Sequence, residues 1–166
     1  MKITIKPWLF FALIISIATA GCGFQLRGKA DIPYTSLYVE GNGAVVNNLR
    51  QLITAGGHKS RLAQSGATAQ RTIQILSETS TMIIIALSSA GYVSEYQLQY
   101  RVKYRVLKHN KEVLAPVEIA LSRDMSYNNT QPYAYAQEES FLTQDMQNDA
   151  AQQILLRIAL SHDKKL

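Results

Sequence analysis

The sequence predicts an α+β fold in which two helices pack on one face of a mixed, roughly four-stranded sheet, in the order β-α-β-β-β-α. Three observations predict it: a long alternating segment in the middle of the chain, apolar residues at helical spacing on either side of it, and short turn sequences between the strand candidates. The chain has 166 residues, which is enough for one compact domain.

A short strand and a helix open the predicted domain. Leu37 to Glu40 is a strand candidate, and the sequence Gly41-Asn42-Gly43 interrupts it. The apolar residues that follow at helical spacing are Val45, Leu49, Leu52 and Ile53. We expect this helix to end at Gly56-Gly57, where a left-handed cap is easily formed.

The next apolar segments have strand character. Arg71 to Leu76 alternates in its first part, and Met82 to Leu87 is a continuous apolar run. They are interpreted either as arms of one long strand or as two strands, with a bulge near Ser77 to Ser80.

The most regular pattern runs from Glu95 to Val106. Aromatic and aliphatic residues alternate there with charged and amide residues, which predicts one buried and one polar sheet face. His109-Asn110-Lys111 provides a turn, and Val113 to Ser122 returns as a further strand. Pro116 suits an edge strand or a bulge.

A long helix closes the predicted fold after a loop at 128–132. Its apolar positions are Leu142, Met146, Ala150, Ile154 and Ile158, with Leu155 beside them. About two dozen helical residues would extend about 36 Å. The predicted helix between the first two strands makes a crossover connection, which predicts that these two strands are parallel. The short hairpin turns predict that the other strands are antiparallel.

The N-terminus has the order of a secretory signal. Lys2 and Lys6 precede an apolar run from Trp8 to Ala18, which is too short to span a bilayer as a stable helix. Small residues then lead to Cys22, the single cysteine of the chain. We therefore predict a signal peptide at 1–21, a lipidated tether at 22–36 and one domain at 37–166.

The residues around Cys22 resemble a bacterial lipobox, with Thr19 where leucine is usual. The resemblance implies that the Cys22 thiol takes a diacylglycerol and that its amino group is acylated, so that several acyl chains anchor the domain. Gly23 follows, whereas Asp at that position favours inner-membrane retention in the enterobacterial sorting rule. We therefore expect a lipid anchor on the periplasmic side of the outer membrane.

The charge of the mature chain is modest. Seventeen Lys and Arg residues include Lys2 and Lys6, so fifteen remain against twelve Asp and Glu, a net charge of +3. An exported domain with this small excess is not expected to bind nucleic acid. An anionic lipid head group is a better placed partner.

Four segments of the mature chain resemble one known family. They are Gly21 to Arg27, Ser94 to Leu98, Gln144 to Met146, and Ala150 to Leu155. Together with the predicted element order, they are similar to the LptE family of outer-membrane lipoproteins, from Cys22 to about Leu160. The resemblance implies a non-enzymatic role: a plug in the lumen of the LptD barrel that helps the barrel assemble and contacts lipopolysaccharide.

Two groups of residues are candidates for the barrel interface. Gln144, Gln147 and Gln152 bear uncharged amides on the last helix, which suit a polar lumen because they are cheaper to desolvate than charges. Tyr133 and Tyr135 are aromatic residues of the kind that anchor interfaces. A simply solvated amide face, and tyrosines packed on the domain's own core, remain alternatives.

Arg101, Lys103 and Arg105 share the polar face of the alternating strand at intervals of about 6.6 Å. Three cations in a row suit lipopolysaccharide or another anionic partner, although a solvated face or cross-strand pairing with Glu118 is an alternative. The resemblance would also place lipopolysaccharide contacts at Ser88 to Gly91 and at Ala136-Gln137, but these segments contain no Lys or Arg.

Other functions have weaker support. His58, His109 and His162 are far apart in the predicted fold, and the chain has no nucleophile elbow, CxxC or phosphate-binding loop. We therefore expect no catalytic site, metal or cofactor. The alternatives are an accessory lipoprotein of another outer-membrane assembly machine or an envelope enzyme, and the partner that co-purifies would distinguish them.

Overall fold

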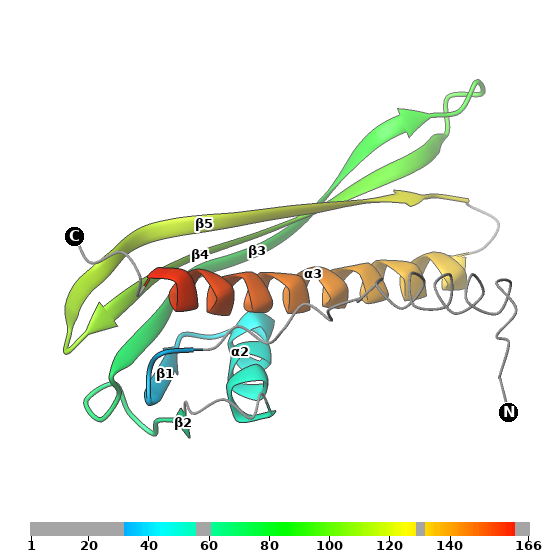
Figure 1. Cartoon of the computed structure of the whole chain (residues 1–166). Helices are drawn as coiled ribbons and strands as arrows, with labels where there is room; N and C mark the ends of the chain where they lie inside the picture. The colour runs from blue at the N-terminus through cyan, green and yellow to red at the C-terminus, as the bar shows by residue number, and fades with distance from the viewer. Residues whose placement is uncertain (1–31, 56–60, 129–131, 162–166) are drawn as a thin grey trace, which may run out of the picture.

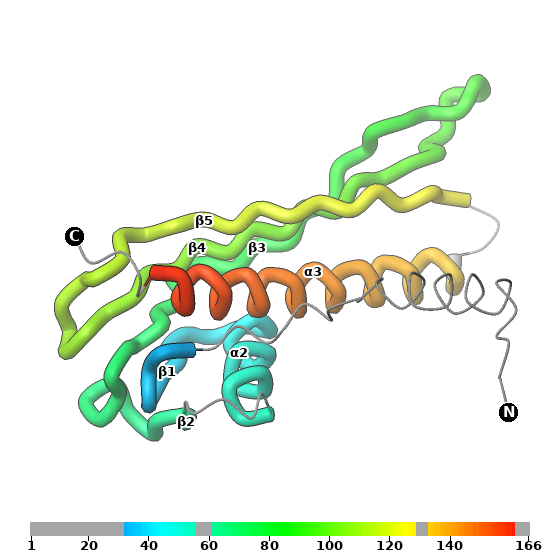
Figure 2. Tube along the Cα trace, viewed as in Figure 1, coloured from blue at the N-terminus to red at the C-terminus, as the bar shows by residue number. Residues whose placement is uncertain are grey.

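The computed structural model describes residues 32–55, 61–128 and 132–161, which form a two-layer fold (Figures 1 and 2). Its elements are β1 (Ser36–Glu40), α2 (Ala44–Ala55), β2 (Arg61–Leu62), β3 (Arg71–Leu87), β4 (Val93–Lys108), β5 (Lys111–Ser126) and α3 (Pro132–Ser161).

The sheet has the strand order β2-β1-β3-β4-β5. β1 is parallel to both of its neighbours, and the long strands β3, β4 and β5 are antiparallel. Figure 1 shows α2 and α3 on the same side of the sheet, with α3 along the long strands. The predicted α+β class, the two helices on one face and the parallel first pair are confirmed.

Three details differ from the sequence prediction. The two-residue strand β2 was not predicted, because two residues have no periodic signal, and it brings the sheet to five strands. The helix α3 is longer than predicted, with 30 residues, and Pro132 occupies its start, where a missing N–H is harmless. Ile32 and Tyr34, which we assigned to the tether, are only 2% and 5% exposed and belong to the core.

The strand β3 is one continuous strand with a bulge. Ile75 pairs with Tyr104 and Ser77 pairs with Lys103, so Leu76 is the extra residue, one position before the range expected. Because a bulge shifts the alternation by one residue, the even-numbered residues after it share the face on which Ile75 is buried. The bulge therefore directs Glu78 toward the helical layer.

The turn at His109-Asn110 is a tight two-residue hairpin loop. Both residues have positive φ, 48° and 62°, as the favoured hairpin turn requires. Lys108 and Lys111 form the last pair of the β4–β5 ladder next to it. Pro116 lies in the edge strand β5 where the register shifts, as predicted.

The core lies between the sheet and the two helices. β4 contributes alternate residues from Leu98 to Val106, and α3 contributes Met146, Ala150, Ile154 and Ile158, which are at most 1% exposed, as their spacing predicted. Ala151 and Leu155 of α3 are also buried, and α2 packs against α3. Burial of these side chains supplies most of the stabilisation.

Charged residues also connect α3 to the sheet. Arg123 of β5 lies 3.0 Å from Asp145 and 3.4 Å from Asp149 of α3. The side chains are about one third to one half exposed, so solvent weakens the attraction and the pairs add little to the packing of the helix on the sheet.

The glycine before α2 has a specific role that a substitution can test. Gly43 has φ +117°, and a Cβ at this position would collide with the carboxylate of Glu78. Gly43→Ala should lower the free energy of unfolding by about 1 to 3 kcal/mol, measured by urea denaturation.

The matched control is Gly91→Ala in the β3–β4 turn. Gly91 also has positive φ, +80°, but a Cβ there would have no atom within 4 Å. Its substitution should therefore be less destabilising than Gly43→Ala, and equal losses for the two variants would contradict this explanation.

Candidate functional site

The predicted lipidation site, Cys22, lies outside the described residues, as do the predicted signal peptide and most of the tether. Acylation of Cys22 therefore stays a prediction. The described chain begins at Ile32, whose side chain is buried in the core.

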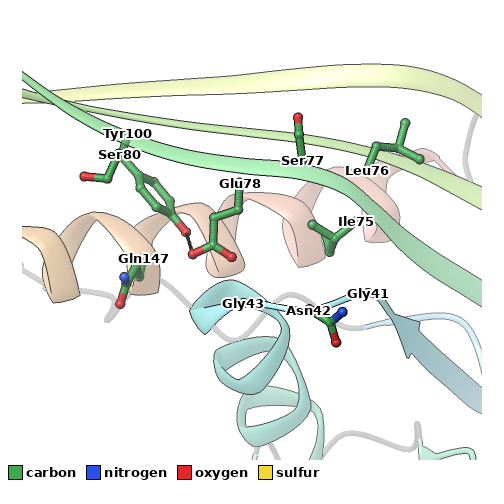
Figure 3. A pocket seen from close by; sticks show the side chains of 10 residues that line it. All are labelled: Gly41, Asn42, Gly43, Ile75, Leu76, Ser77, Glu78, Ser80, Tyr100 and Gln147. Carbon is green, nitrogen blue, oxygen red and sulfur yellow. Dashed lines mark hydrogen bonds between the residues drawn. The ribbon is translucent and has the colours of Figure 1, made fainter.

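A carboxylate joins the long hairpin to the helical layer. The Tyr100 hydroxyl donates a hydrogen bond to Glu78 Oε1 at 2.7 Å, and the backbone N–H of Val45 donates to Glu78 Oε2 at 3.4 Å. We call Gly43, Val45, Glu78 and Tyr100 the Glu78 cluster; Figure 3 shows Gly43, Glu78 and Tyr100. The carboxylate accepts an otherwise unpaired N–H of the first turn of α2 and is favoured by the helix dipole.

An open hollow of about 550 Å³ adjoins the Glu78 cluster. It lies where β1 separates from β3, and Gln147 of α3 forms part of its wall (Figure 3). Its remaining lining residues come from the turn after β1, from β3 beside the bulge, and from Tyr100. Its polar groups are a carboxylate, a phenol, two amides and hydroxyls, which suit hydrogen bonding to a polar group of a partner.

The phenol of Tyr100 is held neutral. Burial raises the pKa of Tyr100 well above its ordinary value, and the hydrogen bond to Glu78 and the negative charge of Glu78 raise it further. Tyr100 therefore acts as a hydrogen-bond donor across the neutral range. Burial also raises the pKa of Tyr104, and the charge of Arg157 opposes part of that rise.

The predicted basic row lies on the sheet face opposite the helices. Arg101 pairs with Glu118 of β5 at 3.3 Å, and Arg105 pairs with Glu112 at 3.4 Å and donates to the Gln74 side chain at 2.6 Å. The cross-strand pairing that the sequence left open is therefore present. Because the two ion pairs are partly exposed, they hold the arginines only weakly against competition from another anion.

The predicted interface glutamines are divided between two environments. Gln144 and Gln152 are exposed on α3, whereas Gln147 is partly buried and lines the hollow. Gln144 donates to the Ser140 hydroxyl at 3.4 Å within the same helix. The structure therefore leaves Gln144 and Gln152 accessible to a partner.

The two predicted interface tyrosines, Tyr133 and Tyr135, also lie in different environments. Tyr133 is 89% exposed at the start of α3. The ring of Tyr135 lies 4.9 Å from that of Tyr127 and 5.8 Å from that of Tyr96, in edge-to-face or tilted contacts, and its hydroxyl lies 2.8 Å from Met82 Sδ. Tyr135 thus packs on its own domain, the alternative considered above, while Tyr133 is available to a partner.

One exposed apolar surface was not assigned from the sequence. In the far half of β3, Met82 to Ile85 and Leu87 are 41% to 60% exposed. We call residues 77–87 the β3 edge segment. The available signal was the absence of Asp, Glu, Lys and Arg from residues 79–94, together with an unbroken apolar run that is apolar on both faces of a strand.

The described residues contain no catalytic constellation of the kinds considered above. His109 is exposed in a hairpin turn, while His58 and His162 lie outside the described ranges. Within 32–55, 61–128 and 132–161, no group of three or more His, Cys, Asp or Glu residues is arranged to hold a metal ion. No helix in these ranges is long and apolar enough to cross a bilayer.

Comparison with known proteins identifies the family. The profile of the LptE family, described as lipopolysaccharide-assembly, matches residues 34–158. This chain belongs to the LptE family.

Relatives of this LptE-family chain include LPS-assembly lipoprotein LptE of Pectobacterium atrosepticum, 25% identical over 158 residues that cover 89% of this chain and 84% of the relative. The protein of the same name from Yersinia enterocolitica is 24% identical and covers 88% of this chain and 72% of its own length.

Solved structures share the fold of this LptE-family chain. Lipoprotein B from Nitrosomonas europaea, solved by solution NMR, is 32% identical with a TM-score of 0.74 and covers 86% of this chain and 94% of its own. Rare lipoprotein B from Shewanella oneidensis is 20% identical with a TM-score of 0.67, covers 76% of this chain and 96% of its own, and supports the fold alone.

The raised pKa of Tyr100 predicts a pH dependence of stability. The unfolded phenol titrates near its ordinary value of about 10, whereas the folded phenol keeps its proton to higher pH. This contribution is fully present below about pH 10 and is lost as the pH rises toward the folded pKa. From about pH 8 to about pH 11, the wild type should lose about 1 kcal/mol more unfolding free energy than Tyr100→Phe.

Urea unfolding at the two pH values measures this difference. The Tyr100→Phe comparison is needed because other tyrosines and lysines titrate in the same range in both proteins. Identical losses in the two proteins would mean that Tyr100 ionises in the folded state as readily as in the unfolded state.

Proposed function

We propose that the mature chain is a non-enzymatic, lipid-anchored subunit of lipopolysaccharide assembly that occupies the lumen of an LptD-type outer-membrane barrel. Membership of the LptE family supports the role in lipopolysaccharide assembly. The sequence around Cys22 supports the anchor and the location at the outer membrane. The polar surface described below supports placement inside a barrel rather than against lipid.

The observation that carries this proposal is a long module whose open sheet face is polar and carries amide side chains beside its charged ones. β3 has 17 residues and would extend about 55 Å, and α3 has 30 residues and would extend about 45 Å, comparable to the thickness of a bilayer with its head groups. On β4, the Gln99 amide donates to Gln97 at 3.0 Å, and Gln97 donates to Asp124 of β5 at 2.8 Å. Such side chains can exchange hydrogen bonds with a polar lumen at little desolvation cost.

The aromatic residues on α3 would add specific contacts. Tyr133 and Phe141 are 89% and 69% exposed, which is unusual for large aromatic side chains on a structured helix. Gln144 and Gln152 are exposed on the same helix. We assign this side of α3 to the barrel wall.

The basic row on β4 supports a second contact, with lipopolysaccharide. Lys103 has no ion pair with a described residue, and the arginines on either side of it are held only by partly exposed carboxylates. A phosphate group can replace those carboxylates as a stronger, doubly charged partner. We assign Arg101, Lys103 and Arg105 to the phosphate-bearing head group.

The test of the proposed function is co-purification from detergent-solubilised envelopes with an affinity tag on the chain. LptD should be recovered with the wild-type lipoprotein, and its yield should fall for Cys22→Ser, which cannot be anchored. Radiolabelled palmitate should label the wild type and leave Cys22→Ser unlabelled. Recovery of a different barrel without LptD would assign the chain to another assembly machine.

The two tyrosines make a matched pair for the barrel interface. Tyr133→Ala should reduce LptD recovery while changing the free energy of unfolding by less than about 0.5 kcal/mol, because its side chain is exposed. Tyr135→Ala should instead lower the unfolding free energy by about 2 kcal/mol, because it removes two ring contacts. Undiminished LptD recovery with Tyr133→Ala would remove Tyr133 from the interface.

The basic row predicts salt-dependent lipopolysaccharide binding. Arg101→Gln combined with Lys103→Gln should reduce lipopolysaccharide retained by the immobilised chain about fivefold at low ionic strength, with a smaller difference in high salt. Lys108→Gln combined with Lys111→Gln, at the β4–β5 turn, changes the net charge equally and is the control. Equal reductions in the two double variants would indicate a general charge effect rather than a site.

A further inference from the structure

The β3 edge segment has a paired strand on only one side. β1 pairs with β3 from Arg71 to Gln74, whereas β4 pairs with β3 as far as Leu87. Among the described residues, no strand continues the ladder on the outer side of residues 77–87. In Figure 1 the far part of the β3–β4 hairpin also rises away from α3. Outward-directed N–H and C=O groups along this edge therefore lack a strand partner.

The side chains of the β3 edge segment are apolar on both faces. Consecutive residues of a strand point to opposite faces, and Met82 to Ile85 are all exposed. Proteins usually protect such edges with lysine, proline or a bulge. Residues 79–94 contain no charged residue and no proline. The strand does have a bulge near its end, but the extra residue there is the apolar Ile85.

The chemistry of the edge limits what can cover it. Lipid acyl chains can cover isoleucine side chains but cannot bond free backbone N–H and C=O groups, so an open sheet edge is not stable in hydrocarbon. A partner helix has the same deficiency, because its own backbone groups are already paired. An extended strand supplies both backbone hydrogen bonds and side chains for the two faces.

We propose that the β3 edge segment binds an extended segment of a partner polypeptide, which adds to the sheet as a further strand next to β3. The bound segment has uncharged, largely apolar side chains opposite Met82 to Leu87. We assign it to the LptD-type barrel, and in this assignment alone the inference rests on the proposed function.

The hollow beside the Glu78 cluster defines one end of the bound strand. Ser77, Glu78 and Ser80 belong both to the edge and to the wall of the hollow. Each oxygen of the Glu78 carboxylate accepts one hydrogen bond within the domain and has capacity for another. The bound segment therefore has a side chain with an N–H or O–H donor where it meets Glu78, which fixes its register along β3.

Hydrogen exchange of the whole complex tests the backbone pairing. The lipidated chain is purified with LptD, and amide exchange in residues 77–87 is compared with that of the chain alone in the same detergent. Because alternate N–H groups of a strand point to opposite edges, about every second amide should become at least tenfold slower to exchange in the complex. A recovered complex in which these amides exchange as in the free chain would overturn the inference and leave the proposed function standing.

Photo-crosslinking identifies what lies against the edge. A benzophenone amino acid replaces Ile83, and the same residue replaces Val113 of β5, 52% exposed, as the matched control. Crosslinks from position 83 to one contiguous segment of LptD, absent from position 113, support the proposal. Crosslinks only to lipopolysaccharide or to a second copy of the chain overturn it, and failure to recover LptD at all overturns both the source of the strand and the proposed function.

A charge substitution gives a functional measure. Ile83→Lys combined with Ile85→Lys places two cations along the edge and should lower LptD recovery at least tenfold. Val113→Lys combined with Ala115→Lys, at two exposed positions of β5, adds the same charge and is the control. Unchanged recovery in the double variant would overturn the proposal, and since both side chains are over 40% exposed, thermal unfolding of the isolated variant checks that the domain remains folded.

Discussion

The bulge at Leu76 and the carboxylate that it redirects are the constraint on which the arrangement of the layers depends. Without the extra residue, position 78 would lie on the open face of the sheet, away from the helices. With it, Glu78 accepts hydrogen bonds from Tyr100 and from the N-terminus of α2. Gly43 is the residue that permits this approach, because any side chain there would occupy the position of the carboxylate.

The bulge divides the strand β3 into two halves, one that packs in the domain core and one that we propose binds a partner. Before the bulge, β3 lies between β1 and β4, and Ile73 and Ile75 contribute to the core. After it, β1 has ended and the strand continues with one edge uncovered by described strands. The half that stabilises the domain and the half proposed to bind a partner are thus adjacent parts of one strand.

The three surfaces assigned to partners differ in chemistry, and each suits a different contact. The exposed side of α3 has aromatic and amide side chains, the open sheet face has cations and amides, and the β3 edge segment has free backbone groups with aliphatic side chains. A protein bound on several sides by one barrel would need such varied surfaces. Family membership gives the role in lipopolysaccharide assembly, and the surface chemistry is the basis on which we propose the barrel as the partner.

The sequence by itself determined the fold class, the parallel first pair of strands, the buried positions of β4 and α3, and the family resemblance. These properties follow from periodicity and local motifs, which act over a few residues and are visible in one dimension. The tertiary structure decided that Arg101 pairs with Glu118 and that Tyr135 packs on Tyr127 while Tyr133 stays exposed. It also decided that β3 continues beyond the end of β1. Each of these depends on register and on which elements end first, so the apolar run from Met82 to Leu87 could be assigned to a strand but not to an uncovered edge.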